Sequence, residues 1–333
     1  MKTHDLRHLS ATRSRSLATR LSAVTLGLGV LVLSACDEPL DPGTQVSSLR
    51  VLAVQADNTF AAPGETVHMQ ALSVDPANRP ITWAWALCAH PVSSSVESCI
   101  LDVAVTAAET GMPPLLGMGE GVDNVDVTIP ADILAGINPE ARPSALVGVL
   151  SIACPGTLDL NVDPSTAMDP NNPLPIRCTD ANGVELGLHD TIIGVKRVFI
   201  RETDRNANPV IERVTFDGED WPADVIQEVD SCETDEFVYD DCKDKGSHQL
   251  AAVVSDASFE SGIDEFGRNF AEDVIVQHYN TDGIFQYEVR IGEEPTTGWV
   301  ARSSASGSDV PIWFVARDDR GGVSYTSRTV HVR

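Results

Sequence analysis

Basic residues are scarce in this chain of 333 residues: Lys and Arg total 23 against 49 Asp and Glu, a formal net charge of −26. A surface this negative repels phosphate backbones, so we expect no nucleic-acid partner. Aromatic residues are also few, at 5%. The hydrophobic fraction of 42% still indicates a folded globular protein. The length predicts about two domains.

The motifs of common catalytic sites are absent. After residue 35, no two histidines lie three or four residues apart, as a helical zinc pair would need. The sequence has no G-x-S-x-G elbow, no Walker motif, no GxGxxG turn and no Cys-x-x-Cys pair. We therefore expect no enzyme, no catalytic residue and no organic cofactor. A hydrolase whose site is assembled from distant residues is a less favoured alternative.

The N-terminus has the pattern of a secretory signal. Five bases and one acid occupy residues 1–20, and residues 21–35 then run without a charge. A basic segment followed by about fifteen apolar residues and a small-residue exit is typical of an exported protein. A membrane-spanning helix needs ~20 apolar residues, so this segment is short for one.

The exit reads Leu33-Ser34-Ala35-Cys36, which resembles the lipobox of bacterial lipoproteins. The resemblance implies that residues 1–35 are removed and that Cys36 is lipidated. The alternative is an ordinary signal peptide followed by an unrelated cysteine. In the lipoprotein case, residues 36–46 are the lipidated cysteine and an extended tether. This implies a lipid-anchored protein of a Gram-negative-type cell envelope, with the outer membrane favoured and the inner membrane possible because of Asp37.

Six cysteines follow the lipobox, and an even number in an exported chain implies disulfides. Fifteen connectivities are possible. Pairing of nearest neighbours is the most economical and keeps each bridge within one expected domain. The six residues are Cys88, Cys99, Cys154, Cys178, Cys232 and Cys242.

Short apolar runs alternate with turn residues along the mature chain, which predicts antiparallel strands. One helix is expected at 131–136, after Pro130, and a long loop insertion at 155–190. The cleanest alternation is 284–291, expected as a single strand, and 310–316 should be a central strand. The other expected strands are 48–56, 65–74, 80–88, 123–129, 145–154, 191–201, 210–216, 247–256, 273–280 and 323–332.

The polar segment 202–209 is the expected linker between two domains, 47–201 and 210–333. Each would be an antiparallel β-sandwich with a disulfide-pinned loop insertion. The strand after Ala62-Pro63-Gly64, the Trp83-Ala84-Trp85 run and the closing hairpin 310–332 resemble bacterial immunoglobulin-like and PKD-type domains. The resemblance implies an all-β fold and a spacer, adhesion or partner-binding role. It departs from the antibody pattern, since no cysteine pair is placed to bridge two sheets around these tryptophans.

Acidic residues gather in 217–244, which holds twelve acids and few bases. Clustered carboxylates are the oxygen ligands that Ca²⁺ prefers, although no spacing here matches an EF-hand loop. Solvated loops that keep the protein soluble are the favoured alternative. The candidate Ca²⁺ ligands are Asp230, Glu233, Asp235, Glu236, Asp240 and Asp241.

Two tryptophans, Trp221 and Trp299, lie in segments rich in turn residues. Either could be an exposed contact for a glycan or a partner, with local packing as the favoured alternative. Trp83, Trp85 and Trp313 lie within expected strands and should be core.

The sequence thus predicts a lipid-anchored, non-enzymatic scaffold or display module of the cell envelope. Its partners would be the membrane, through the lipid, and another envelope protein or a surface polysaccharide. The alternative is a Ca²⁺- or glycan-dependent adhesion module at the cell surface.

Overall fold

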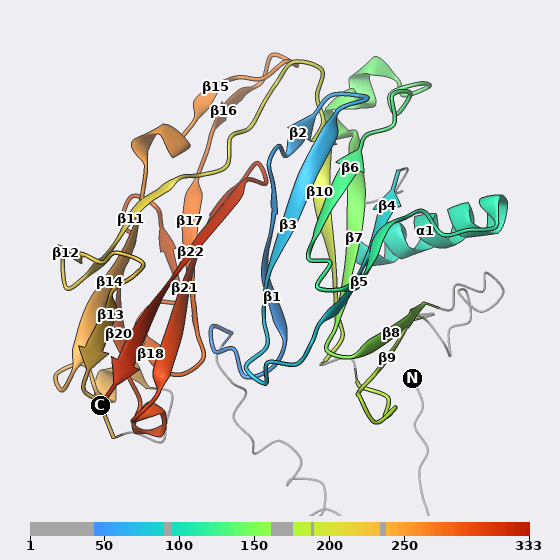
Figure 1. The fold of residues 1–333 in the computed structure, drawn as a ribbon. Helices are drawn as coiled ribbons and strands as arrows, with labels where there is room; N and C mark the ends of the chain where they lie inside the picture. Colours follow the sequence, from blue (N-terminus) through green and yellow to red (C-terminus); the bar gives the residue numbers. More distant parts are fainter. Residues whose placement is uncertain (1–42, 90–94, 161–175, 188–189, 234–237) are drawn as a thin grey trace, which may run out of the picture. The chain divides into compact units, whose positions relative to one another are not determined.

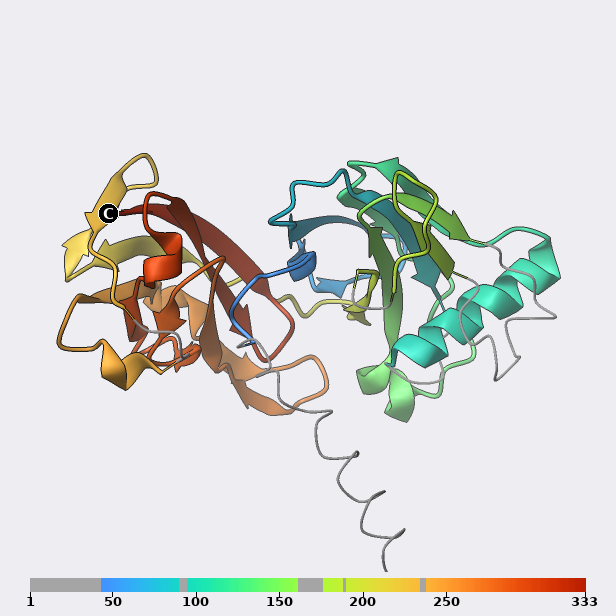
Figure 2. The same ribbon diagram turned by 90° about the horizontal axis from the view of Figure 1, so that it is seen from below.

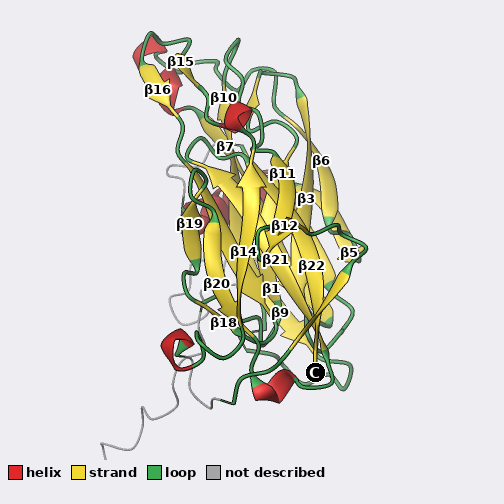
Figure 3. Ribbon diagram, turned by 90° about the vertical axis from the view of Figure 1, so that its left-hand side faces the viewer, coloured by secondary structure: helices red, strands yellow, loops and turns green. Residues whose placement is uncertain are grey.

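The computed structural model describes residues 43–89, 95–160, 176–187, 190–233 and 238–333. Strands dominate these residues (Figure 3) and form four larger sheets and two small two-stranded ones. The all-β prediction is confirmed. The signal segment, Cys36 and the first part of the tether lie outside the described residues. None of the described helices is long and apolar enough to cross a membrane.

The first sandwich is built from strands between residues 50 and 200 (Figure 1). One sheet has the order β1-β3-β6 and the other the order β2-β10-β7-β4-β5. Neighbours are antiparallel except β2 and β10, which run parallel. The strands are β1 (Arg50–Ala56), β2 (Phe60–Ala61), β3 (Thr66–Val74), β4 (Thr82–Cys88), β5 (Leu115–Glu120), β6 (Asn124–Thr128), β7 (Leu146–Cys154) and β10 (Ile192–Ile200).

The second sandwich uses strands between residues 211 and 332. Its sheets have the orders β12-β11-β14-β20-β18 and β13-β22-β21-β17-β19. The strands are β11 (Ile211–Phe216), β12 (Glu219–Asp220), β13 (Ile226–Val229), β14 (Ser247–Val254), β17 (Val274–Asn280), β18 (Ile284–Phe285), β19 (Val289–Ile291), β20 (Thr296–Val300), β21 (Asp309–Asp318) and β22 (Val323–Val332).

Smaller elements lie outside the four larger sheets. The described part of the chain has one α-helix, α1 (Val96–Thr110), and two hairpins that form the two-stranded sheets. The hairpin strands are β8 (Thr157–Leu160), β9 (Ile176–Thr179), β15 (Ser261–Ile263) and β16 (Asn269–Ala271). Short 3-10 turns cover η1 (Pro139–Ser144), η2 (Tyr239–Asp241), η3 (Asp256–Ser258) and η4 (Ser303–Ala305).

The two sandwiches share the same strand topology. In each, the first strand pairs with the long strand that follows it, as β1 does with β3 and β11 with β14. A short strand runs parallel to the last strand of each sandwich, as β2 does to β10 and β13 to β22. The last strand also pairs antiparallel with a long neighbour, as β10 does with β7 and β22 with β21. This is the strand order of immunoglobulin-like domains, so that prediction is confirmed from topology.

The two cores contain the large apolar side chains that alternation places inward. In the first sandwich the rings of Trp83 and Trp85 stack at a centroid distance of 5.4 Å, and the indole of Trp85 donates to the Val122 carbonyl. In the second, Phe314 on β21 lies in the core, and β21 is a central strand as predicted. Trp313 points the other way and packs between the two sandwiches.

The disulfides join Cys88 to Cys99, Cys154 to Cys178 and Cys232 to Cys242, the pairs that sequence proximity predicts. The first connects β4 to α1 and the second connects β7 to β9. None of the three joins the two facing sheets of a sandwich. Disulfides of this kind are typical of a protein exported to an oxidising compartment.

Two local predictions are wrong. Residues 284–291 are two short strands in different sheets, since β18 pairs with β20 and β19 pairs with β17. The chain crosses from one sheet to the other between them, and this crossing leaves Tyr287 and Ile291 exposed. The helix expected at 131–136 is a run of turns. The α-helix lies instead at α1, in a segment for which the sequence analysis expected no element.

The end of the tether and the linker both pack on the second sandwich. Val46 N–H donates to the Asn280 carbonyl, and Val46 is buried beside Trp313. In the linker, Asn208 donates to the Ala56 carbonyl at 2.7 Å and accepts from Val323 N–H at 2.9 Å. Asn208 of the expected linker is therefore hydrogen-bonded to both sandwiches.

Candidate functional site

The outer face of the β4–β7 sheet is apolar, which is unusual for an antiparallel sheet whose other face already covers a core. Trp83 and Trp85 point inward, so Ala84 and Ala86 point outward. Leu150 and Ile152 on β7 pair with these two alanines and share the outer face. The sequence WAWA on β4 thus makes one face bulky and the other flat.

Helix α1 covers part of this outer face, on the side of the sheet opposite β1 and β3 (Figures 1 and 2). The Ser95 side chain accepts from Ser98 N–H and caps its first turn, while Gly111, at φ 79°, ends it in the left-handed region. Cys99, Val103 and Ala107 are buried against the sheet. The Cys88–Cys99 disulfide fixes the helix to β4.

The β8–β9 hairpin covers another part of the same face. Thr157 pairs with Thr179 at its base, and Leu158 is buried in the same apolar cluster as α1. The Cys154–Cys178 disulfide ties the hairpin to the end of β7. Both covering elements are therefore covalently held to the sheet.

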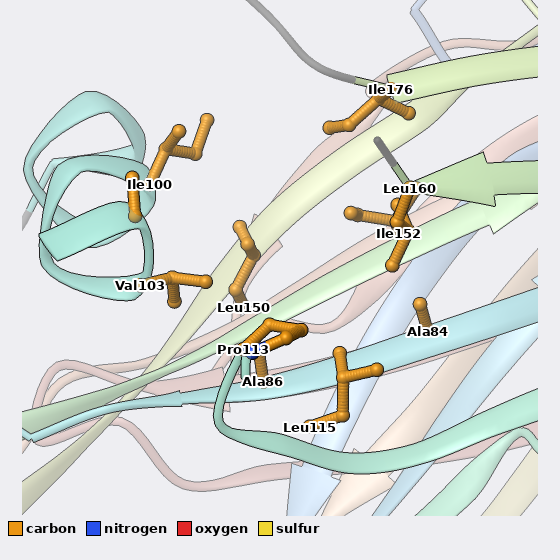
Figure 4. Close-up of a pocket in the computed structure, with 11 residues that line it drawn as sticks. Ala84, Ala86, Ile100, Val103, Pro113, Leu115, Leu150, Ile152, Leu160 and Ile176 are labelled. Carbon is orange, nitrogen blue, oxygen red and sulfur yellow. The ribbon is translucent and has the colours of Figure 1, made fainter. Parts of the chain in front are cut away.

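A groove remains between α1, the hairpin and the sheet (Figure 4). Figure 4 shows Ile100 and Val103 on the helix side, Leu160 and Ile176 on the hairpin side, and sheet residues below. The groove is small, with a cavity volume of about 40 Å³. Every lining residue is apolar: Ala84, Ala86, Ile100, Val103, Ala104, Pro113, Leu115, Leu150, Ile152, Leu160 and Ile176. Such a surface can bind hydrocarbon but offers no side chain for acid–base chemistry.

Further apolar side chains are exposed on α1, on β5 and between them. Leu101 and Val105 lie one turn apart on the outer side of α1, Met112 follows the helix, and Leu115 and Met118 project from β5. Each is 40–71% exposed. Leu115 also lines the groove, whereas Leu101 and Val105 lie on the side of α1 away from the sheet. We call the groove and these five side chains the α1–β5 surface.

The segment that contains α1 and β5 has more acids than bases. Residues 96–120 contain four acids, Glu97, Asp102, Glu109 and Glu120, and no Lys or Arg. No basic residue lies in the last turn of α1.

The tryptophans suggested as surface contacts are buried, so that suggestion is wrong. Trp221 is 1% exposed, and its indole donates to the Val225 carbonyl at 2.8 Å. Trp299 is 0% exposed and lies on β20, in the second core. Turn residues surround both, but these turns fold back over the sandwich. Neither indole can stack on a glycan.

The described carboxylates of the candidate Ca²⁺ set do not converge. Asp230 forms an ion pair with Arg333 at 3.0 Å, and Asp240 pairs with Lys243 at 3.3 Å. No group of three or more potential metal ligands occurs among the described residues, which include Glu233 and Asp241. Asp235 and Glu236 lie outside the described residues, so Ca²⁺ binding stays a prediction.

The strongly shifted ionisable groups lie away from the α1–β5 surface. Burial lowers the pKa of His278 to about 4 and that of Lys196 to about 8. Burial also raises the pKa of Glu272 to about 7, despite the bond that Arg320 donates to it. His68 is exposed and paired with Asp126 at 2.8 Å. His331 forms the same kind of pair with Asp309.

No protein family matches this chain, and no curated protein matches it. Among solved structures, it is similar to the N-terminal Ig1-2 module of the Drosophila receptor protein tyrosine phosphatase DLAR, with 9% identity, TM-score 0.23 and coverage of 86% of this chain and 99% of that one. It is also similar to the Yersinia pseudotuberculosis adhesin InvE, with 11% identity, TM-score 0.19 and coverage of 85% and 60%.

A nucleoside hydrolase-related hypothetical protein from Saccharophagus degradans also matches, with 13% identity and TM-score 0.22 over 40% of this chain. The chain spans 27% of that protein's length. TM-scores of this size carry no argument about function. The immunoglobulin-like assignment therefore rests on the strand order described above.

Sequence reasoning missed the α1–β5 surface because it missed α1. The sequence contains two signals for this helix: Ser95 before residues 96–110 is a typical helix start, and Gly111 after them is a typical helix stop. Between them, buried positions recur at Cys99, Val103 and Ala107, a helical spacing.

Proposed function

We propose that this protein is a lipid-anchored module of the bacterial cell envelope that binds a partner protein through the α1–β5 surface and catalyses no reaction. The observation that carries the proposal is the open apolar groove, which two disulfides hold against the outer face of an immunoglobulin-like sheet. Immobilising both walls before binding reduces the entropy lost when a partner docks.

The anchor is supported by the lipobox resemblance at Cys36 and by three disulfides that suit an exported protein. Seven residues lead from Cys36 to Gly43, and an extended chain spans at most about 3.5 Å per residue. The lipid would therefore hold Gly43 within about 25 Å of the membrane. The module would act close to the membrane surface.

Substitution Cys36→Ser tests the anchor. We expect the wild type in the membrane fraction and the variant, once residues 1–35 are removed, in the soluble envelope fraction, because removal of the apolar segment without lipidation takes away both anchors. Metabolic labelling with a fatty acid should mark the wild type alone. An unlabelled wild type that still sediments with membranes would contradict lipidation.

Site-specific crosslinking tests the binding surface. A photoreactive residue at Leu101, exposed on α1, should crosslink to one defined protein in living cells. The same residue at Ile263 on the second sandwich, which is 69% exposed against 44% for Leu101, is the control. The captured protein is then purified, and its affinity should fall at least tenfold with Leu101→Glu. Equal capture at both positions, or an affinity unaffected by Leu101→Glu, would contradict the proposal.

Protease treatment of intact cells carrying a C-terminal tag after Arg333 identifies the compartment of the partner. Loss of the tag would favour a partner outside the cell, and protection until lysis would favour a periplasmic one.

A further inference from the structure

Another group of exposed apolar side chains lies on and beside β19, the edge strand of the sheet β13-β22-β21-β17-β19 (Figure 3). Val289 and Ile291 pair with residues of β17 whose side chains point away from the second core, and their alternate spacing places both on that outer face. Their exposed fractions are 46% and 54%, and Tyr287, two residues earlier, is 48% exposed. We call these three side chains the β19 patch.

The aromatic member of the β19 patch has a cation beside it. The guanidinium carbon of Arg290 lies 4.9 Å from the centroid of the Tyr287 ring, and Arg290 also donates to the Glu294 carbonyl at 2.9 Å. Tyrosine and arginine both have an apolar body and a polar tip, which suits the boundary between water and lipid. The composition of the patch therefore fits contact with a membrane surface.

The chain that leads back to Cys36 leaves the second sandwich beside the β19 patch. Residues 44–46 form a parallel bridge with the end of β17, where they bond to the N–H and the carbonyl of Asn280 at 3.1 and 2.8 Å. A Cβ added to Gly43 would lie 3.8 Å from a carboxylate oxygen of Glu288, which lies between two patch residues in the sequence. These contacts fix the start of the tether next to the patch.

The length of the tether limits how far the β19 patch can lie from the lipid on Cys36. Seven residues lead from Cys36 to Gly43, and an extended chain of that length spans at most about 25 Å. A tethered surface meets the bilayer at a high effective concentration, so it can dock through a contact too weak to recruit a free protein. Each large apolar side chain that leaves water on docking favours the docked state by about tenfold.

Charge indicates which lipid surface fits. The protein has a net charge of −26, and Glu288 lies within the segment that carries the patch. Anionic headgroups would be repelled by this charge, whereas zwitterionic headgroups would not. A zwitterionic lipid surface is therefore the occupant that the observations favour.

Resting on the lipid anchor proposed above, we propose that the β19 patch docks on the zwitterionic surface of the bilayer that holds Cys36. The lipid and the patch then make two contacts with one membrane. Two contacts fix the orientation of the second sandwich, which a flexible tether alone would leave free.

The test uses the mature lipidated protein in phosphatidylcholine vesicles. A small environment-sensitive fluorescent amino acid replaces Ile291, and part of the lipid carries a nitroxide quencher near the headgroup. We expect blue-shifted emission and quenching at this position. The matched control places the same amino acid at Ile226 on β13, which is 55% exposed and lies at the opposite edge of the same sheet. The control position should show neither effect.

Val289→Glu locates the contact. It should lower the docking equilibrium reported by the fluorophore at Ile291 by about tenfold, because an apolar side chain is lost from the membrane contact. Ile226→Glu should leave the equilibrium unchanged. Both side chains are exposed, so we expect neither variant to change the melting temperature. Equal quenching at Ile291 and Ile226, or no response to Val289→Glu, would overturn the inference.

Fatty-acid labelling separates this inference from the anchor. If the protein is labelled but the fluorophore at Ile291 is not quenched, the anchor stands and docking of the patch fails. If the protein is not labelled, the anchor fails and the inference fails with it. If a purified envelope protein, but not the vesicles, shifts the emission at Ile291, a protein covers the patch and the inference is overturned. Crosslinking at Leu101 tests the α1–β5 surface independently of all these results.

Discussion

At the residue scale, two buried ionisable groups of the second sandwich give opposite responses to pH. His278 lies in the core between the rings of Phe285 and Phe314, and burial lowers its pKa to about 4. Glu272 has almost no exposed side chain and receives a bond from Arg320, yet burial raises its pKa to about 7. The ordinary values for these groups are 6.5 and 4.5.

The sign of each effect follows from which state binds more protons. For His278, the unfolded chain binds the extra proton between pH 6.5 and 4, so stability is lost as the pH falls through that range. For Glu272, the folded chain holds the extra proton between pH 4.5 and 7, so stability is lost as the pH rises through that range. In the wild type the two slopes partly cancel.

Single variants should expose each slope. In Glu272→Gln, the free energy of unfolding should rise from pH 4.5 to 6.5 more steeply than in the wild type. In His278→Phe, the free energy of unfolding should fall from pH 4.5 to 6.5 relative to that of the wild type. Each effect amounts to at most about 3 kcal/mol, and urea unfolding at several pH values measures it. Profiles parallel to that of the wild type would contradict both assignments.

One glycine is required by contact as well as by conformation. Gly283 has φ 116°, and a Cβ added there would lie 2.5 Å from Nε1 of the buried Trp299. We expect Gly283→Ala to lower the free energy of unfolding by on the order of 3 kcal/mol. Gly187→Ala is the matched control, since a Cβ there meets nothing within 4 Å. Equal denaturation midpoints for the two variants would refute this role for Gly283.

At the element scale, a disulfide adds to the apolar contacts that hold α1 on the sheet. Four residues of α1 are buried, and its outer side carries exposed Leu101 and Val105. The Cys88–Cys99 bridge closes a loop with a sequence separation of 11 residues. Such a bridge contributes about 3 kcal/mol in the chain-entropy model.

Replacing Cys88 and Cys99 together by alanine should therefore release α1. We expect faster hydrogen exchange for the amides of α1 while those of β21 keep their protection. The matched control replaces Cys232 and Cys242 and should leave α1 protected. Unchanged exchange in the first variant would mean that apolar packing alone holds the helix.

At the scale of the whole molecule, the two sandwiches share an apolar cluster and several hydrogen bonds. Leu52 and Ala53 on β1 pack with Trp313 and Val315 on β21. Lys196 on β10 donates to the Gly321 carbonyl of the second sandwich. These contacts predict that the sandwiches unfold together.

A carboxylate in this cluster should separate the two unfolding events. Leu52 is 3% exposed, so Leu52→Glu buries a charge among apolar side chains. We expect one calorimetric transition in the wild type and two in the variant, with one in the exposed control Ile263→Glu. Two transitions already present in the wild type would show that the cluster does not couple the sandwiches.

The sequence by itself determined the features that depend on local order. The pattern of apolar runs and turn residues gave eleven of the twelve expected strands near their observed positions, because this patterning acts within each strand. The disulfide pairs followed from proximity along the chain. The resemblance to a lipobox at Cys36 is a linear pattern that only the sequence records, and lipidation there stays a prediction.

The tertiary structure decided what depends on contacts between distant residues. Residues 284–291 keep a perfect alternation, yet two different sheets compete for them, and pairing with β20 and β17 divides the run. Trp221 and Trp299 are buried because turns fold over them, which no local pattern records. The α1–β5 surface exists because a helix, a hairpin and a sheet edge from separate parts of the chain meet on one face of the first sandwich.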